Sequence, residues 1–244
     1  MNCLRPLRFG EKQDVTLMGV KAVVFDLDGT LVSFNLDYRT VRAEVRSYLL
    51  RIGVPASQLS ANESIFEMLK KAELFLRNSG KSAETVEAIR SEVLAIAEKY
   101  ELEAAASTSL LPGADETLKA LKRMGLKIGL CTINSEKSAN YILQRFRIAD
   151  FFDVTVPRNK VNYVKPNPEH IEVTLKALGV APEETVVVGD SGVDMQSVKA
   201  LKAIAVGLPT GVATMEQLTS HGANYIITSI TDLPVLVEKI NKAQ

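Results

Sequence analysis

Carboxylate side chains stand in the sequence where two apolar runs end. Asp26 and Asp28 close the run Val20–Asp26, and Asp190 closes a later run, with Asp194 four residues further on. Carboxylates that share one spot repel one another, so they require a cation. Hard oxygen donors without a neighbouring cluster of histidine or cysteine suit Mg²⁺, which also takes water and a substrate phosphate as ligands. These residues predict a magnesium site that can hold a phosphate ester.

Two further segments carry polar groups that could contact the same phosphate. A third apolar run ends with Thr132 and is followed closely by Asn134, so a hydroxyl and an amide stand at its carboxyl end. Lys165 opens the segment Lys-Pro-Asn-Pro at 165–168, where two prolines fix the loop and keep the lysine out of helical geometry. On its own this lysine would be an ordinary solvated side chain. Beside carboxylates, a metal ion and a phosphate, its ammonium group would balance the negative charge of the carboxylates and the phosphate.

Six apolar segments have the character of strands that a parallel sheet buries on both faces. Five are nearly continuous in apolar residues rather than alternating, and Phe151–Val156 is a weaker sixth run. Helical patterns lie between them, and two of these end before Gly125 and Gly179. The alternation predicts the α/β class with a doubly wound, Rossmann-like parallel sheet, in which ligands bind beyond the carboxyl ends of the strands. The expected strands are Val20–Asp26, Lys127–Thr132, Phe151–Val156, Thr185–Asp190, Ala203–Gly207 and Tyr225–Thr228.

A long stretch without any strand-like run interrupts this alternation. It contains three apolar patterns with i, i+3, i+4, i+7 spacing, each typical of an amphipathic helix. We therefore expect an all-helical insert within the α/β core. The expected organisation is an N-terminal tail at 1–19, a core domain at 20–34 and 107–244, and a helical domain at 35–106.

Composition narrows the classes of partner and compartment. The 244 residues are 46% hydrophobic, which excludes a disordered chain. The 29 basic and 29 acidic residues balance without a basic cluster, so neither nucleic acid nor an anionic membrane is an expected partner. No apolar run reaches the length of about 18 residues that spans a bilayer, and the first 19 residues lack the apolar stretch of a signal peptide. Two cysteines, Cys3 and Cys131, fit a reducing compartment, so we expect a cytoplasmic protein with Cys131 in its core.

Three other catalytic templates are missing from the sequence. It has no P-loop, no Gly-x-Gly-x-x-Gly after the first strand and no Gly-x-Ser-x-Gly elbow. Nucleotide hydrolysis of the P-loop type, a dinucleotide fold and an α/β-hydrolase are therefore disfavoured. Neither His170 nor His221 lies near the acidic motifs, and we expect surface or capping roles for both.

Four segments, taken in order, carry a resemblance to a known family. They read VVFDLDGTLV at 23–32, CTIN at 131–134, KPNP at 165–168 and GDSGVDM at 189–195. With these motifs the chain, from residue 20 to about 240, resembles the haloacid dehalogenase (HAD) superfamily. Within it, the chain is similar to the phosphoglycolate-phosphatase-like branch, which carries a helical cap after the first motif.

The resemblance implies a role for each matching residue. Asp26 would be the nucleophile that forms an aspartyl-phosphate, and Asp28 would protonate the leaving alcohol and then activate water. Thr132 would hydrogen-bond a phosphoryl oxygen, and Lys165 would balance negative charge on Asp26 and the phosphoryl group. Mg²⁺ would be held by the carboxylates of Asp26 and Asp190 and by the backbone carbonyl of Asp28.

Three more residues receive supporting roles from the same resemblance. Asn134 would contact the phosphate together with Thr132, and Gly29 would allow a tight turn beneath it. Asp194 would orient metal-bound water or Lys165 rather than ligate the metal itself. An acidic residue at position 28, two after the nucleophile, implies cleavage of C–O–P esters rather than dehalogenation or phosphonate cleavage.

We therefore expect a cytoplasmic, Mg²⁺-dependent phosphatase of small phosphorylated metabolites, with phosphoglycolate as the first substrate, acting as a monomer or homodimer. A HAD-family pyrophosphatase or sugar-phosphate mutase is an alternative among enzymes, and a non-catalytic HAD-fold binding or regulatory protein is an alternative of another class. The helical insert would be a cap that contacts the leaving group. Arg39, Arg42 and Arg46 lie about one turn apart on its first helix. We interpret them as a solvated helix face, and contact with an anionic leaving group is the alternative.

Overall fold

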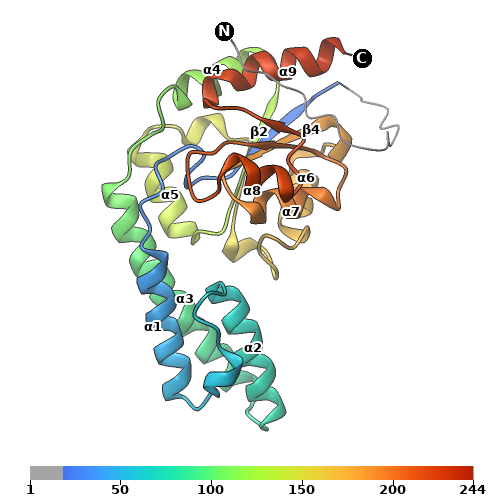
Figure 1. The fold of residues 1–244 in the computed structure, drawn as a ribbon. Helices are drawn as coiled ribbons and strands as arrows, with labels where there is room; N and C mark the ends of the chain where they lie inside the picture. The colour runs from blue at the N-terminus through green and yellow to red at the C-terminus, as the bar shows by residue number, and fades with distance from the viewer. Residues whose placement is uncertain (1–18, 244) are drawn as a thin grey trace. The chain divides into compact units, whose positions relative to one another are not determined.

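The computed structural model describes residues 19–243 as two units (Figure 1). The α/β unit contains residues 19–34 and 108–243, and the helical unit is Asn35–Ser107. The expected N-terminal tail, with Cys3, lies outside the described residues except for Gly19. Among the described residues, none of the helices combines the length and the apolarity needed to cross a membrane.

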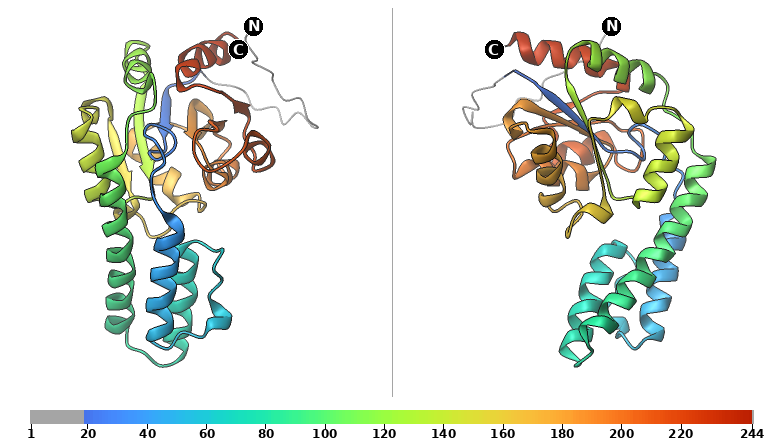
Figure 2. Two further views of the ribbon diagram at one scale, coloured as in Figure 1. Left: turned by 60° about the vertical axis from the view of Figure 1, so that its left-hand side comes forward. Right: turned by 180° about the vertical axis from the view of Figure 1, so that it is seen from behind.

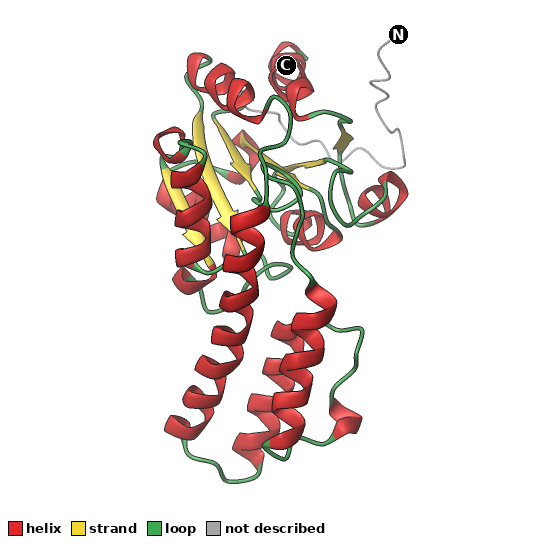
Figure 3. Cartoon of the chain, turned by 90° about the vertical axis from the view of Figure 1, so that its left-hand side faces the viewer, coloured by secondary structure: helices red, strands yellow, loops and turns green. Residues whose placement is uncertain are grey.

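A six-stranded parallel sheet is the centre of the α/β unit (Figure 3). Its order is β3-β2-β1-β4-β5-β6, and in this register Val24 of β1 lies opposite Gly129 on one side and Val187 on the other. All four residues of β1 are buried, as continuous apolarity predicts for a central parallel strand. The strands are β1 (Ala22–Phe25), β2 (Lys127–Thr132), β3 (Val154–Pro157), β4 (Thr185–Gly189), β5 (Ile204–Gly207) and β6 (Tyr225–Ile226).

Helices cover both faces of this sheet (Figure 2). Connections between parallel strands are right-handed, so the direction in which the chain crosses the sheet decides the face on which each helix lies. The helices that precede β2 and β3 lie on one face, and those that precede β4, β5 and β6 lie on the other. The first group is α4 (Ala114–Arg123) and α5 (Glu136–Arg145), with α9 (Leu233–Lys242) packed on α4. The second group is α6 (Glu169–Leu178), α7 (Gly192–Lys199) and α8 (Met215–Ser220). The predicted doubly wound α/β fold is confirmed.

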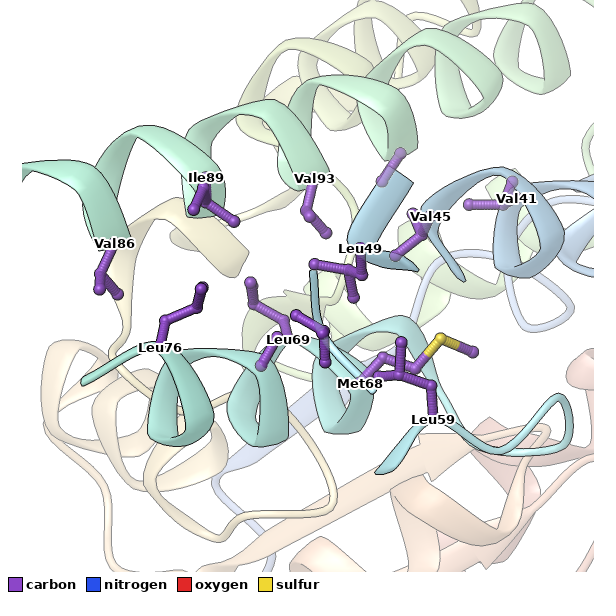
Figure 4. Packing of buried hydrophobic residues seen from close by; sticks show 13 residues of the cluster. Val41, Val45, Leu49, Leu59, Met68, Leu69, Leu76, Val86, Ile89 and Val93 are labelled. Atoms are coloured by element: carbon purple, nitrogen blue, oxygen red, sulfur yellow. The ribbon is translucent and has the colours of Figure 1, made fainter. Parts of the chain in front are cut away.

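The helical unit consists of α1 (Tyr38–Arg51), α2 (Ile65–Asn78) and α3 (Ala83–Ser107) around a core of its own (Figure 4). Asp37 caps α1 by accepting from the Thr40 N–H at 3.1 Å, and Ser64 caps α2 in the same way, each cap worth about 1 kcal/mol. The apolar stripes that predicted three amphipathic helices meet in this core. Their buried members include Val41, Val45 and Leu49 of α1, Met68, Leu69 and Leu76 of α2, and Val86, Ile89 and Val93 of α3.

One of the two histidines does not lie where we expected it. His170 is fully buried rather than at the surface, because it stands on the face of α6 that packs against β2 and β3. Its ring Nε2 lies 3.0 Å from the carbonyl oxygen of Val156, and burial lowers the pKa of His170 to about 4. His221 is the C-cap residue of α8. Cys131 is buried in β2, where desolvation raises the pKa of its thiol to about 12 and leaves it a core residue.

Candidate active site

Three neighbouring strands deliver polar side chains to one edge of the sheet. Asp26 directly follows β1, Thr132 ends β2, and Asp190 directly follows β4. β1 pairs with β2 on one side and with β4 on the other, and the Asp26 N–H continues the ladder by donating to the Val188 carbonyl at 2.9 Å. These carboxyl ends lie where the strand order reverses, which is where open α/β sheets bind ligands.

The ammonium group of Lys165 is the centre of a buried network. Its Nζ donates to Asp26 Oδ1 and Asp194 Oδ1, each at 2.6 Å, and to the carbonyl oxygen of Cys131 at 2.9 Å. An ammonium group has three protons, so these three acceptors satisfy it fully. The side chain of Lys165 is only 2% exposed. Lys165 is therefore not an ordinary solvated lysine. Its side chain links the end of β1 to β2 and α7.

Burial and neighbouring charges shift the pKa values of Asp26, Asp190 and Lys165. Desolvation raises the pKa of Asp26 to about 6, although the adjacent Lys165 opposes this rise. Desolvation, together with the charges of Asp194 and Asp26, raises the pKa of Asp190 to about 8. Burial by itself would lower the pKa of Lys165, but the charges of Asp194 and Asp26 raise it well above its ordinary value. The lysine therefore stays charged. The carboxylates repel one another, so additional positive charge would stabilise their ionised forms.

The acidic cluster has the donors and the charge deficit of a divalent cation site. Carboxylate oxygens of Asp26, Asp190 and Asp194 all lie within 4.8 Å of one another, and the three residues are buried. In the fully ionised form that a cation would bind, one ammonium group against three carboxylates leaves two negative charges without compensation. The cluster contains neither thiolate nor imidazole, so its oxygen donors suit Mg²⁺ better than zinc.

Asp194 has both carboxylate oxygens committed to protein donors. Oδ1 accepts from Lys165, and Oδ2 accepts from the backbone N–H of Ser191 at 3.1 Å and from the Ser191 hydroxyl. The bond from the Ser191 N–H is one half of the capping box that starts α7, and the Asp194 N–H, which donates to the Ser191 side chain, is the other half. Asp194 is thus placed to hold Lys165, while Asp26 and Asp190 are better placed to hold a cation.

Asn134 and Thr132 are linked to each other and to Asp28. The side-chain Nδ2 of Asn134 donates to Asp28 Oδ2 at 2.6 Å, so the amide fixes the orientation of that half-buried carboxylate. Thr132 Oγ1 accepts from the Asn134 N–H at 3.2 Å, a bond that does not use the hydroxyl proton of Thr132. The predicted contacts of Thr132 and Asn134 with phosphate stay predictions, and the amide of Asn134 has a second task in holding Asp28.

No motif in the sequence pointed to the loop at 208–213, which follows β5 and wraps Asp190. The Val212 N–H donates to Asp190 Oδ2 at 2.9 Å, and the hydroxyl of Thr210 donates to the carbonyl of Gly29. Gly29 has φ +79°, which favours glycine, and a Cβ there would lie 2.5 Å from Asp190 Oδ2. A Cβ on Gly211 would overlap the same oxygen. The only signal in the sequence is a run of turn residues, Leu-Pro-Thr-Gly, directly after a strand.

We expect Gly211→Ala to weaken cation binding at this cluster. The added methyl group cannot share space with Asp190 Oδ2, so the carboxylate must move, and displaced groups of this kind typically cost about 10- to 100-fold in metal affinity. Calorimetric titration of the purified chain with Mg²⁺ measures the change. Val212→Ala is the matched control, because it alters the same loop, removes an exposed side chain and keeps the backbone donor to Asp190. Equal Mg²⁺ affinity for Gly211→Ala and wild type would refute the positioning role.

Comparison with known proteins agrees with this geometry. The family model for haloacid dehalogenase-like hydrolases matches residues 20–202. A phosphoglycolate phosphatase of Pseudomonas putida is 27% identical over 87% of this chain and 78% of its own length. The pyrophosphatase PpaX of Bacillus mycoides is 26% identical over 92% of this chain and 100% of its own length. A solved β-phosphoglucomutase of Clostridium difficile shares the fold, with TM-score 0.64 and 22% identity over 92% of this chain and 98% of that one.

The chain therefore belongs to the haloacid dehalogenase-like hydrolases, and the resemblance to its phosphoglycolate-phosphatase-like branch is confirmed. The prediction of a phosphatase enzyme is confirmed at the level of class. The relatives differ among themselves in the phosphate compound that their names give, so the family by itself does not choose a substrate for this chain.

Proposed function

We propose that this protein is a Mg²⁺-dependent phosphatase of small phosphomonoesters, that it works through an aspartyl-phosphate on Asp26, and that phosphoglycolate is the first substrate to test. The observation that carries the proposal is the Lys165 network. A buried ammonium group keeps one carboxylate ionised at a strand end, and a second carboxylate, on Asp28, lies two residues further along. The complete set of polar groups argues against a non-catalytic binding protein of the same fold.

In the first step, a carboxylate oxygen of Asp26 attacks phosphorus. An O–P bond to Asp26 forms, the P–O bond to the alcohol breaks, and the electron pair stays on the leaving oxygen. That oxygen takes the proton of the Asp28 carboxyl group, whose orientation Asn134 fixes. Lys165 keeps Asp26 ionised in an environment that otherwise favours its protonated form.

In the second step, water removes the phosphoryl group from Asp26. Asp28, now ionised, accepts a proton from the water molecule as its oxygen attacks phosphorus, and the bond to Asp26 breaks. The products are inorganic phosphate and a regenerated carboxylate. A single residue can serve first as acid and then as base because the first step leaves it deprotonated.

Asp26 and Asp190, with the backbone carbonyl of Asp28, are the groups that would hold Mg²⁺. Bound there, the ion would polarise a phosphoryl oxygen and neutralise charge between the carboxylates and the substrate. Asp194 holds Lys165, and the loop at 208–213 holds Asp190, so each carboxylate of the cluster has a protein donor that fixes it.

We propose that the helical unit, 35–106 in the expected boundaries, is the cap that screens the reaction from water. The same proposal assigns a cytoplasmic protein, monomeric or homodimeric, without a nucleic-acid or membrane partner. Size-exclusion chromatography with light scattering decides the oligomeric state.

The test of the proposed function is a comparison of kcat/KM over a panel of phosphate compounds. The panel contains phosphoglycolate, sugar phosphates, nucleoside monophosphates and inorganic pyrophosphate, each with Mg²⁺ and after removal of metal with EDTA. We expect release of phosphate that depends on Mg²⁺ and is fastest with a small monoester. Preference for pyrophosphate would favour the activity that the name of the Bacillus mycoides relative gives. No release of phosphate from any member would end the proposal.

A further inference from the structure

A cavity of about 640 Å³ lies on the helical unit, between one face of α1 and the segment at 61–62 that precedes α2. Its charged lining residues are Arg39, Arg42 and Arg46, and no carboxylate lines it. The sequence spacing had indicated a solvated helix face. The structure shows that these three arginines, each at least partly exposed, line a common hollow, whose volume is in the range of small-molecule sites.

Within the described part of the chain, Asp37 offsets part of the charge of Arg39, and no ion pair offsets the charge of Arg42 or Arg46. None of the three forms an ion pair with a described carboxylate, whereas Arg90 of the same unit pairs with Glu73 at 2.9 Å. The acidic side chains close in sequence are used elsewhere. Asp37 accepts from Thr40, and Glu44 accepts from the hydroxyl of Tyr100.

Like charges at i, i+3 and i+4 spacing destabilise a helix. An anion seated among the three guanidinium groups would remove this repulsion.

The protein holds two of these guanidinium groups in place. The Arg42 guanidinium stacks over the Tyr38 ring, 4.7 Å from the ring centre, and Arg46 Nε donates to the Leu59 carbonyl at 3.1 Å. Both side chains are half-buried. Fixing Nε leaves the terminal nitrogens of Arg46 as donors, so less conformational freedom is lost when a ligand binds. Asn62, which also lines the cavity, adds an amide that can donate to an anion.

We propose that this cavity is a binding site for a small anion that carries a phosphate or carboxylate group. Guanidinium groups recognise both through paired hydrogen bonds, and pre-held arginines without carboxylate partners are the donors that such a ligand needs. The anion has two sources, the charged leaving group of a substrate or a free anion in solution. The site rests on the helical unit alone, so it stands or falls independently of the catalytic proposal.

The test is calorimetric titration of the full chain, freed of metal on a chelating resin, with inorganic phosphate. Without metal, the excess negative charge around Asp26 disfavours anions in the α/β unit, so the titration reports the arginine cavity. We expect Arg42→Gln to weaken phosphate binding about tenfold or more, and the double change with Arg46→Gln to abolish it. Arg51→Gln is the control, because it removes the same charge from the same helix outside the cavity.

Two results would overturn the proposal: wild-type affinity in the Arg42→Gln and Arg46→Gln double variant, or equal weakening by Arg51→Gln. Thermal melts keep the outcome readable, because phosphate should raise the Tm of wild type and Arg51→Gln but not that of the double variant. Kinetics with Mg²⁺ then identify the source of the anion. If the double variant has a higher KM than wild type for phosphoglycolate but not for phenyl phosphate, the anion is the charged leaving group of the substrate. If its KM is unchanged for both substrates, the anion is a free one from solution.

Discussion

Replacing Asp26 with asparagine should lower kcat by at least about 10⁴-fold. The amide oxygen of asparagine is too weak a nucleophile to form the bond to phosphorus. The fold should survive, because the new side chain keeps the size of the old one and Lys165 keeps its bond to Asp194. Phosphate release under saturating substrate with Mg²⁺ measures the effect.

Asp115→Asn is the control for this experiment. It removes a half-buried carboxylate of α4, which among the described ion pairs contacts only Lys119 of the same helix. We expect its kcat to equal that of wild type. A kcat for Asp26→Asn within tenfold of wild type would show that another group attacks phosphorus.

Replacing Lys165 with methionine should lower the free energy of unfolding by about 3–5 kcal/mol at neutral pH. The side chain is nearly isosteric, but it leaves Asp26 and Asp194 buried without the ammonium group that both contact at 2.6 Å. Urea denaturation of metal-free protein measures the loss. Activity should fall as well, because Asp26 would no longer be held ionised.

The pH dependence of this loss has a definite sign. Burial raises the pKa of Asp26 to about 6 even with Lys165 present, and removing the ammonium group raises it further. Acidification from pH 7 to pH 5 then protonates the carboxylate and removes part of the penalty, so the difference between variant and wild type should shrink. Lys122→Met is the control, because its pair with Asp153 is partly exposed and should contribute less than about 1 kcal/mol. Equal losses for both lysine variants would contradict the role of a buried charge network.

Much of the site could be predicted because strand ends converge. Asp26, Thr132 and Asp190 each follow or end an apolar strand of a parallel sheet, and the carboxyl ends of such strands share one edge. The loop position of Lys165 was also informative, because two prolines mark it as rigid. The chemistry of these residue types then limits the cation and the reaction.

Other contacts could not be read from the sequence. The donor that holds Asp190 is the backbone N–H of Val212, and a backbone group leaves no trace in residue type. Asn134 finds Asp28 across 106 positions of the chain, a pairing that no local spacing encodes.

Burial of His170 and the arginine cavity depend on which other elements cover a helix face. For His170 these are β2 and β3, and for the arginines it is the segment at 61–62. Helical periodicity identifies the face but not its neighbour.

The central claim is that the phosphoryl group is transferred to Asp26, and trapping this intermediate tests it most directly. Asp28→Asn with p-nitrophenyl phosphate is the suitable combination, because this leaving group needs no proton from an acid, whereas attack by water still needs the base. The reaction is quenched in acid, and the digested protein is examined by mass spectrometry. We predict one phosphoryl group on the peptide that contains Asp26, removable by hydroxylamine and missing in the variant that also carries Asp26→Asn. Nitrophenol release without any phosphorylated peptide, or a phosphoryl group on another residue, would contradict the mechanism.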